Sequence, residues 1–168
     1  MNSDELRALQ APLKQKYKND PQSALVTLKA RGQIGEGLTC KIETGRTLVK
    51  AGHHPATGGS GQAACSGDML LEALAACAGV TLNSVATAIG ITIYNGSINV
   101  EGDLDFRGTL GVSKDAPVGF REIRMHYDLD TDADKEQLST LLRLTERYCV
   151  VYQTLKNIPA INISHSFK

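Results

Sequence analysis

The sequence predicts an α+β domain in which helices pack on a mostly antiparallel sheet. Segments that alternate apolar and polar residues precede and follow one long apolar helix, and a second amphipathic helix comes later in the chain. No internal repeat or low-complexity tract interrupts the 168 residues, a length that fits one domain. We expect an N-terminal helical segment at residues 1–20 and the main domain at residues 21–168.

Composition and charge narrow the classes of partner. The chain has 18 basic and 18 acidic residues, which gives no electrostatic reason to expect nucleic acid or an anionic membrane. The N-terminus lacks the pattern of a signal peptide, and the most apolar stretch, 69–80, is interrupted by Glu72 and falls short of the roughly 20 residues that span a bilayer. We therefore expect a cytoplasmic protein whose four cysteines are thiols rather than structural disulfides.

The first half of the chain predicts one surface helix and several short strands. Residues 3–18 have helical spacing, with Ser3 or Asp4 as the cap and Pro21 beyond the end. Residues 24–31 alternate as a half-buried strand does, and glycines at 32, 35 and 37 then break the chain. Residues 38–42 and 46–50 predict further strands, and residues 51–61 predict a loop.

The second half predicts the core. A helix over 66–89, capped by Ser66 and ended by Gly90, is apolar on most sides and is the expected buried element. Alternation predicts strands at 98–106 and 123–129. Asp132 or Asp134 then opens a second long helix, a shorter helical piece covers 149–156, and a closing strand includes Ile161.

Two cysteines occupy positions where they can meet. Cys77 lies inside the long helix, and Cys149 lies near the apolar face of the second one. Most buried cysteines are inert small hydrophobes, so the pattern alone leaves a structural role open for both. An apolar mid-helix site raises a thiol pKa, so a reactive thiolate needs a cation from elsewhere in the fold. Arg31 is the best candidate and Arg46 is the next.

The remaining cysteines and the histidines offer weaker alternatives. Cys65 comes just before the long helix, where the helix dipole lowers a thiol pKa, so it is an alternative redox thiol or a partner for Cys77. Cys40 lies mid-strand and is expected to be structural. His53 and His54 with these two cysteines match no zinc spacing, so we expect no metal.

Two motifs resemble the OsmC/Ohr family (osmotically inducible protein C and organic hydroperoxide resistance protein). The first motif is GGSG at residues 58–61, followed by CSGDMLLEALAACAGVTL at 65–82, and the second is RYCVVYQTL at 147–155. The family shows a Gly-rich lead, then a Leu/Ala helix that ends in a cysteine, and later a second cysteine. The resemblance covers residues from about 24 to the C-terminus, so the main domain is expected to be OsmC-like.

This resemblance implies a fold and a set of site residues. Mostly antiparallel sheets would wrap around long central helices in an intertwined homodimer with sites at the subunit interface. Arg31 corresponds to the family arginine, which pairs with a glutamate and activates the first cysteine. The glutamate position falls on Gly67, so Asp68 and Glu72 are the candidate carboxylates, and Val150 replaces a proline that often follows the second cysteine.

The resemblance also implies an antioxidant activity in the oxidative stress response. Cys77 would attack an organic hydroperoxide, Cys149 would form a disulfide with it, and a dithiol, including a dihydrolipoyl group, would reduce the pair. No metal or bound organic cofactor is required. A pocket that favours alkyl hydroperoxides would be lined by Leu70, Leu74, Tyr148 and Tyr152. The alternative is a module that binds a small lipophilic ligand in the same pocket without turnover.

Overall fold

The structure is a computed structural model that describes residues 2–20, 25, 31–34, 39–43 and 48–167. The elements are α1 (Ser3–Asn19), β1 (Arg31–Ile34), β2 (Thr39–Glu43), β3 (Leu48–Gly52), the short 3-10 helix η2 (Pro55–Thr57), β4 (Ala64–Cys65), α2 (Ser66–Ile89), β5 (Ile93–Asp103), α3 (Phe106–Thr109), β6 (Glu122–Thr131), α4 (Lys135–Tyr148) and α5 (Val150–Lys156). In the described residues β1 to β4 form one sheet in that order, antiparallel except for the β3–β4 pair, and β5 and β6 form an antiparallel pair. The predicted α+β class is confirmed.

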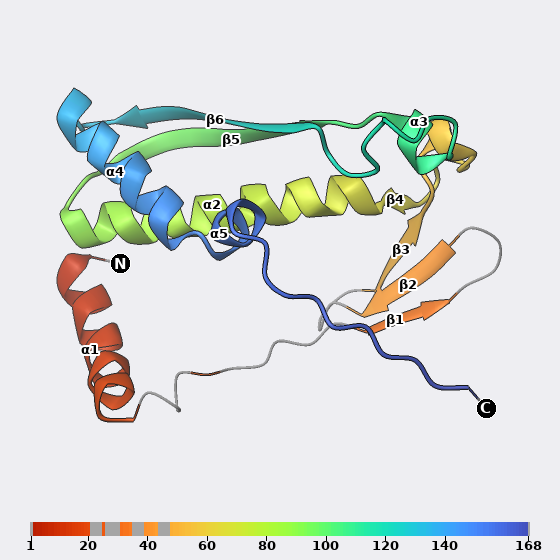
Figure 1. Ribbon diagram of the computed structural model, residues 1–168. Helices are drawn as coiled ribbons and strands as arrows, with labels where there is room; N and C mark the ends of the chain where they lie inside the picture. The colour runs from red at the N-terminus through yellow and green to blue at the C-terminus, as the bar shows by residue number, and fades with distance from the viewer. Residues whose placement is uncertain (1, 21–24, 26–30, 35–38, 44–47, 168) are drawn as a thin grey trace.

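The long helix α2 is the central element, and it lies beneath the β5–β6 pair with α4 and α5 beside it (Figure 1). The predicted bounds 66–89 are confirmed, and Gly90 ends the helix in the left-handed conformation that glycine favours, at φ 74°. The predicted cap is wrong: Cys65 is the N-cap, because Ser66 is already the first helical residue. One face of α2 is buried, comprising Leu74, Ala78, Leu82, Val85 and Ala86.

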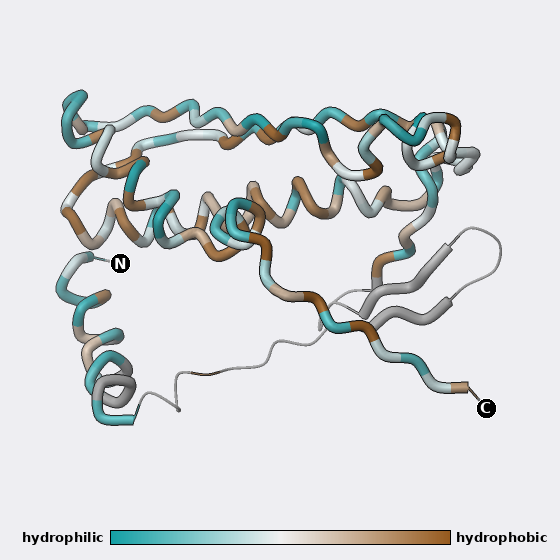
Figure 2. The backbone as a smooth tube through the Cα atoms, in the orientation of Figure 1, coloured by the Kyte–Doolittle hydropathy of each residue, from teal (hydrophilic) through white to brown (hydrophobic). Residues whose placement is uncertain are grey.

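The apolar segment is longer than the expected 69–80. Over its 24 residues α2 has the length and hydropathy of a membrane-spanning helix, and Figure 2 shows it mainly in the white to brown range. Its buried face nevertheless packs against β5, α4 and α5, which is the arrangement of a core helix. One face of α2 therefore belongs to the core, while its other face remains exposed and carries further apolar residues.

The β5–β6 pair and α4 complete this core. The predicted strands are confirmed over their centres, although β5 begins earlier, at Ile93, and Phe106 belongs to α3 instead. Asp134, rather than Asp132, caps α4: its carboxylate accepts from the Glu136 and Gln137 amides, at 2.9 and 2.8 Å, and completes a capping box. The Asp132 carboxylate instead accepts from the Thr92 amide at 2.8 Å.

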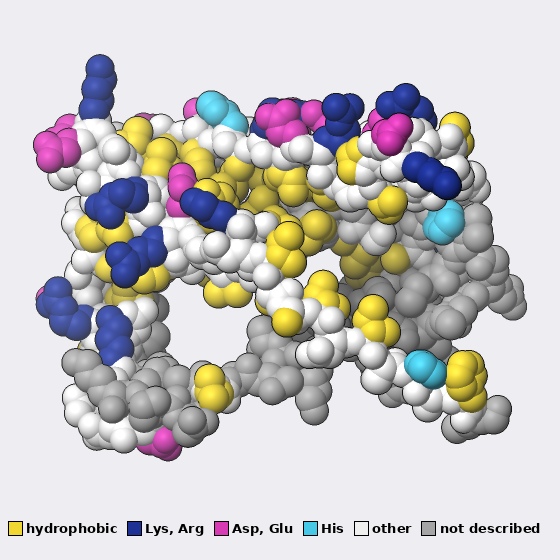
Figure 3. All heavy atoms as spheres, in the orientation of Figure 1, with side chains coloured by type: hydrophobic (Ala, Val, Ile, Leu, Met, Phe, Trp, Pro, Cys, Tyr) yellow, Lys and Arg dark blue, Asp and Glu magenta, His cyan; other side chains and the backbone are white. Residues whose placement is uncertain are grey.

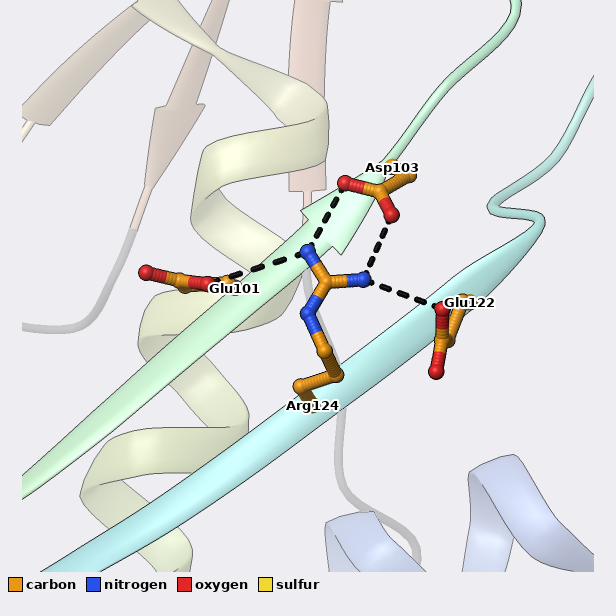
Figure 4. A network of polar contacts seen from close by, with 4 residues as sticks. All are labelled: Glu101, Asp103, Glu122 and Arg124. Carbon is orange, nitrogen blue, oxygen red and sulfur yellow. Dashed lines mark hydrogen bonds and ion pairs between the residues drawn. The ribbon is translucent and has the colours of Figure 1, made fainter.

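A charged network fixes the register of the pair on the solvent face of the sheet (Figure 4). Arg124 of β6 donates to Asp103 of β5 at 2.8 Å and to Glu122 at 3.1 Å, and it lies 3.7 Å from Glu101. The Arg124 hydrogen bond lowers the pKa of Asp103, so the carboxylate stays charged. Cross-strand pairs of opposite charge stabilise one strand alignment over its neighbours. This network lies apart from the buried face that is described below.

Several expectations for the chain ends need correction. Helix α1 is confirmed, but Asn2 caps it instead of Ser3 or Asp4, because Asn2 and Glu5 exchange side-chain to amide hydrogen bonds at 2.8 and 2.9 Å. The closing strand is wrong for the single chain: residues 157–167 have no regular structure, and Ile161 is 77% exposed. An extended segment without a neighbouring strand lacks backbone partners for a sheet.

The predicted strand at 24–31 falls mostly outside the described residues. Its described member Leu25 is exposed and not in a strand, and β1 begins only at Arg31. Gly32 lies within β1 rather than breaking the chain, whereas Gly35 and Gly37 lie outside the described residues. The strands expected at 38–42 and 46–50 correspond to β2 and β3, each shifted toward the C-terminus.

We expect Leu141→Ala to lower the free energy of unfolding by about 2–5 kcal/mol, because it removes a side chain that is 0% exposed and leaves a cavity. Chemical denaturation followed by circular dichroism measures the change. Leu110→Ala, at a position that is 55% exposed, is the matched control with an expected change below about 0.5 kcal/mol. Equal losses in both variants would contradict the placement of the core.

Candidate functional site

The thiols of Cys77 and Cys149 meet between α2 and the joint of α4 and α5. Cys149 is the single extended residue, at φ −71° and ψ 109°, that ends α4 and begins α5. It is 1% exposed and forms a buried cluster with Leu74 and Ala78 of α2, against which the half-buried Cys77 packs. Both cysteines are free thiols, Cys77 packs against the cluster that contains Cys149, and each thiol affects the pKa of the other.

The surroundings of Cys77 favour its thiolate. Burial raises the pKa of the thiol, but contacts with the Val151 amide, the Cys149 thiol, the Val150 amide and the Thr81 hydroxyl together lower it below the ordinary value. Two of these groups are backbone amides in the first turn of α5, where N–H groups have no partner within the helix. The structure therefore supplies neutral donors at the position where the sequence predicted a cation.

The pKa of the Cys149 thiol shifts in the direction opposite to that of Cys77. Burial raises the pKa of its thiol, the contact with Cys77 raises it further, and the amides of Tyr152 and Val151 offset only part of this rise. The Cys149 side chain makes no capping hydrogen bond to α5, so we regard these amide contacts as long and weak. The pKa of Cys77 is thus lowered and the pKa of Cys149 is raised. A thiol of lowered pKa beside one of raised pKa suits a nucleophile and its resolving partner.

The other predicted site residues lie in different places. Arg31 begins β1, but its side chain lies outside the described part of the structure, as does all of Arg46. Asp68 and Glu72 are exposed and line a groove between α2 and β5, not the thiol pair. Leu74 and Tyr152 line a cleft beside the thiols, whereas Leu70 and Tyr148 are 37% and 58% exposed and are not among the residues that line it.

The cleft lies between β6 and the helices α4 and α5 and has a volume of about 790 Å³. Figure 3 shows hydrophobic side chains along the hollow between the sheet and these helices. The lining is mainly apolar with charged groups among it: Leu74, Phe120, Arg121, Glu122, Ile123, Met125, His126, Tyr127, Leu142, Glu146, Tyr152, Leu155 and Lys156. A cleft of this size and character suits a small, largely apolar ligand.

Gly67 occupies the position of the family glutamate, and the described side chains nearest to it are apolar or sulfur-bearing. A Cβ atom there would meet the Phe120 ring at 3.5 Å, the Cys65 sulfur at 3.6 Å and the Leu104 side chain at 3.6 Å. These are ordinary van der Waals contacts, so a small side chain fits at this position.

Cys65 is too far from Cys77 to pair with it. Twelve helical residues separate them, which is roughly 18 Å at the rise of an α-helix. A disulfide requires Cα atoms within about 7 Å. Among the described side chains no three metal-ligating groups gather, and His54 accepts from the Ala56 amide at 3.1 Å as the cap of η2; the side chain of Cys40 lies outside the described part.

Three kinds of group at the site were not predicted from the sequence. The Val150 and Val151 amides carry no side-chain signature, so only the helix break reveals them. The Thr81 hydroxyl is one helical turn beyond Cys77, and that spacing was the available signal. Tyr127 falls within the strand predicted at 123–129, and the available signal was that a tyrosine hydroxyl on an apolar face requires a hydrogen-bond partner.

We expect Thr81→Val to raise the pKa of the Cys77 thiol, because it removes one of the donors that stabilise the thiolate. The pH dependence of alkylation at Cys77, followed by peptide mass spectrometry, measures this shift. Thr87→Val is the control on the same helix, since its hydroxyl donates to the Asn83 carbonyl at 2.8 Å and not to a thiol. A midpoint in Thr81→Val that matches the wild type would show that the hydroxyl has no role.

Comparison with known proteins agrees with this fold. The profile of the OsmC family, described as OsmC-like protein, matches residues 59–164. Proteins named hydroperoxide reductase from Mycoplasma pneumoniae and Mycoplasma genitalium are 29% and 28% identical over 95 and 96 residues, which is 56% and 57% of this chain. The match covers 64% of each relative, so the chain spans less than two thirds of their length.

Solved structures extend the likeness. An OsmC-like protein from Mycoplasma pneumoniae superposes with a TM-score of 0.68 at 20% identity, over 79% of this chain and 89% of that one. An organic hydroperoxide resistance protein OsmC from Legionella pneumophila superposes with a TM-score of 0.62 at 18% identity, over 80% of this chain and 92% of that one. At these identities the likeness concerns the fold alone. Since the family profile covers more than half of the sequence and the folds agree, this chain belongs to the OsmC-like protein family.

Proposed function

We propose that this protein reduces organic hydroperoxides, with Cys77 as the attacking thiol and Cys149 as the resolving thiol. The contact between a thiol of lowered pKa and a buried partner of raised pKa carries the proposal. The relatives that are named hydroperoxide reductase support the same class of reaction. We further infer a cytoplasmic location, where a reduced pair of thiols is maintained.

The proposed reaction has two oxidative steps. The Cys77 thiolate attacks the terminal oxygen of the hydroperoxide, so a sulfur–oxygen bond forms, the oxygen–oxygen bond breaks, and the alkoxide takes a proton and leaves as the alcohol. The Cys149 sulfur then attacks the sulfenic acid, so a disulfide forms, and the hydroxyl leaves as water with the Cys149 proton.

A dithiol restores the enzyme. It transfers two electrons by thiol–disulfide exchange and becomes a disulfide itself, and a dihydrolipoyl group is one reductant of this class. No metal or bound cofactor enters any step. Arg31 is retained as a proposed cation beside Cys77, in addition to the amides and the hydroxyl that act on its pKa, whereas Asp68 and Glu72 line a different groove and are given no role at the thiols.

We also infer that the protein acts as a homodimer. Helix α2 buries only one face, and its other face exposes an apolar stripe of Leu70, Ala73, Ala76 and Val80, of which Val80 is 74% exposed. Small and apolar residues at helical spacing suit close packing against a second copy of the same helix. The segment around Ile161 and Ile163, in which apolar and polar residues alternate, is exposed and is likewise available for pairing with another strand.

The cleft favours a second candidate function. Its apolar lining and volume of about 790 Å³ suit a small lipophilic ligand that is bound without turnover. The loss of the family glutamate at Gly67 is consistent with this alternative. The two functions differ in whether the thiols react.

We expect Cys77→Ser to abolish the turnover of cumene hydroperoxide with dithiothreitol as reductant, because it removes the nucleophile. Cys149→Ser should stop after one oxidation and accumulate a sulfenic acid at Cys77 that dimedone labels. Peroxide consumption and peptide mass spectrometry measure these outcomes.

Cys65→Ser is the matched control and should keep wild-type turnover, since Cys65 lies about 18 Å from Cys77 along α2. Equal rates in wild type and Cys77→Ser would exclude the peroxidase. Unreactive thiols together with a co-purifying lipid in native mass spectrometry would instead favour the binding module.

We expect Val80→Glu to convert the dimer to a monomer, because it places a charge in the exposed apolar stripe of α2. Sedimentation velocity measures the oligomeric state. Val112→Glu, at a loop position that is 72% exposed, is the control and should remain dimeric. A monomeric wild-type protein at micromolar concentration would contradict the inferred assembly.

A further inference from the structure

The hydroxyl of Tyr127 is a buried donor that is left without a partner by the described residues of the chain. Tyr127 lies on β6, and its side chain packs against the buried cluster of Leu74, Ala78 and Cys149. Buried polar groups nearly always form hydrogen bonds, and an exception in a folded protein calls for an explanation. Its location beside the resolving cysteine suggests one.

Cys149, Glu146 and Tyr152 are the ionisable groups that act on the pKa of Tyr127, and Cys149 belongs to the cluster against which the Tyr127 side chain packs. The Glu146 carboxylate already accepts from the Tyr152 hydroxyl at 3.2 Å, so that pair satisfies itself. Burial, together with these neighbours, raises the pKa of Tyr127 to about 12, which keeps the hydroxyl protonated at physiological pH. Tyr127 therefore keeps its proton, and the Cys149 sulfur, which makes no capping hydrogen bond to α5, lies in the cluster that the Tyr127 side chain contacts.

Negative charge develops on Cys149 during the reductive half of the cycle. The first thiolate of a dithiol attacks the Cys77 sulfur, a mixed disulfide forms, and the old disulfide breaks with its electron pair on Cys149. The second thiol of the reductant then loses its proton, closes the reductant disulfide and releases the Cys77 thiolate. Because Cys149 is 1% exposed, water has little access to stabilise the departing thiolate.

We propose that the Tyr127 hydroxyl, which has no hydrogen-bond partner while Cys149 is a thiol, donates to the Cys149 sulfur once it becomes a thiolate, when a dithiol reduces the Cys77–Cys149 disulfide. The donor is in place before the charge appears, which is how a fixed dipole assists a reaction in a site from which water is excluded. This role rests on the proposed peroxidase function. It assigns Tyr127 to the reductive half of the cycle.

The first test measures the pKa of Cys149 directly. In the Cys77→Ser background, thiolate absorbance is titrated against pH, with Cys77→Ser plus Cys149→Ser as the blank. Adding Tyr127→Phe should raise the pKa of Cys149 by about 1, the effect of losing one hydrogen bond to a charged group. Adding Tyr152→Phe instead should leave that pKa within about 0.3 of its starting value, because the Tyr152 hydroxyl is directed to Glu146.

The second test measures rates in the chain that retains both cysteines. Reduction of the oxidised protein by dithiothreitol should be about tenfold slower in Tyr127→Phe than in the wild type. Phe differs from Tyr only by the hydroxyl, and thermal melting of the variant confirms that it folds. An unchanged pKa of Cys149 overturns the proposal, and so do equal reduction rates.

The two proposals fail in different ways. If the wild-type protein neither reacts with peroxide nor forms the disulfide, the peroxidase function fails, and the titration of Cys149 still decides whether Tyr127 contacts its sulfur. If the disulfide forms and Tyr127→Phe behaves as wild type in both tests, only the assignment of Tyr127 is overturned.

Discussion

The candidate site depends on one backbone event, the interruption of the helical chain at Cys149. Because this single residue is extended, α4 ends and α5 begins at the same position. The change of direction places the Cys149 side chain into the buried cluster with Leu74 and Ala78, and it brings the first amides of α5 to Cys77. A continuous helix through residues 135–156 would use those amides internally and leave Cys77 without them.

The same interruption of the helix explains why the pKa values of the Cys77 and Cys149 thiols shift in opposite directions. Both thiols are desolvated, and desolvation alone would raise both pKa values. Cys77 receives donors from α5 and from Thr81 in addition to its partner thiol, and these outweigh its burial. For Cys149, the amides lower the pKa by less than burial and the neighbouring Cys77 raise it. The asymmetry therefore arises from backbone geometry and does not require a charged side chain among the described residues.

Much of the core could be predicted because it depends on side-chain periodicity. The bounds of α2 and the pairing of two cysteine-bearing helices follow from apolar spacing and from the terminal Gly90. The amide donors to Cys77 could not be predicted, because every residue except proline has an amide N–H. The direction of that N–H is set only by the folded backbone. The caps at Asn2 and Cys65 were missed because several neighbouring polar residues compete for one position. The prediction of a closing strand was wrong because alternation of apolar and polar residues shows only which side chains share a face. A strand also needs a neighbouring strand for its backbone hydrogen bonds.

The position of Cys149 has a mechanical consequence. A covalent bond to Cys77 would fasten the joint of α4 and α5 to the middle of α2 and close a loop of roughly 70 residues. Closing a loop of this length restricts the unfolded chain by about 4 kcal/mol. The oxidised form would then have the higher thermal stability. In a cell under peroxide stress, the protein would remain in this more stable form until thiols reduce the disulfide.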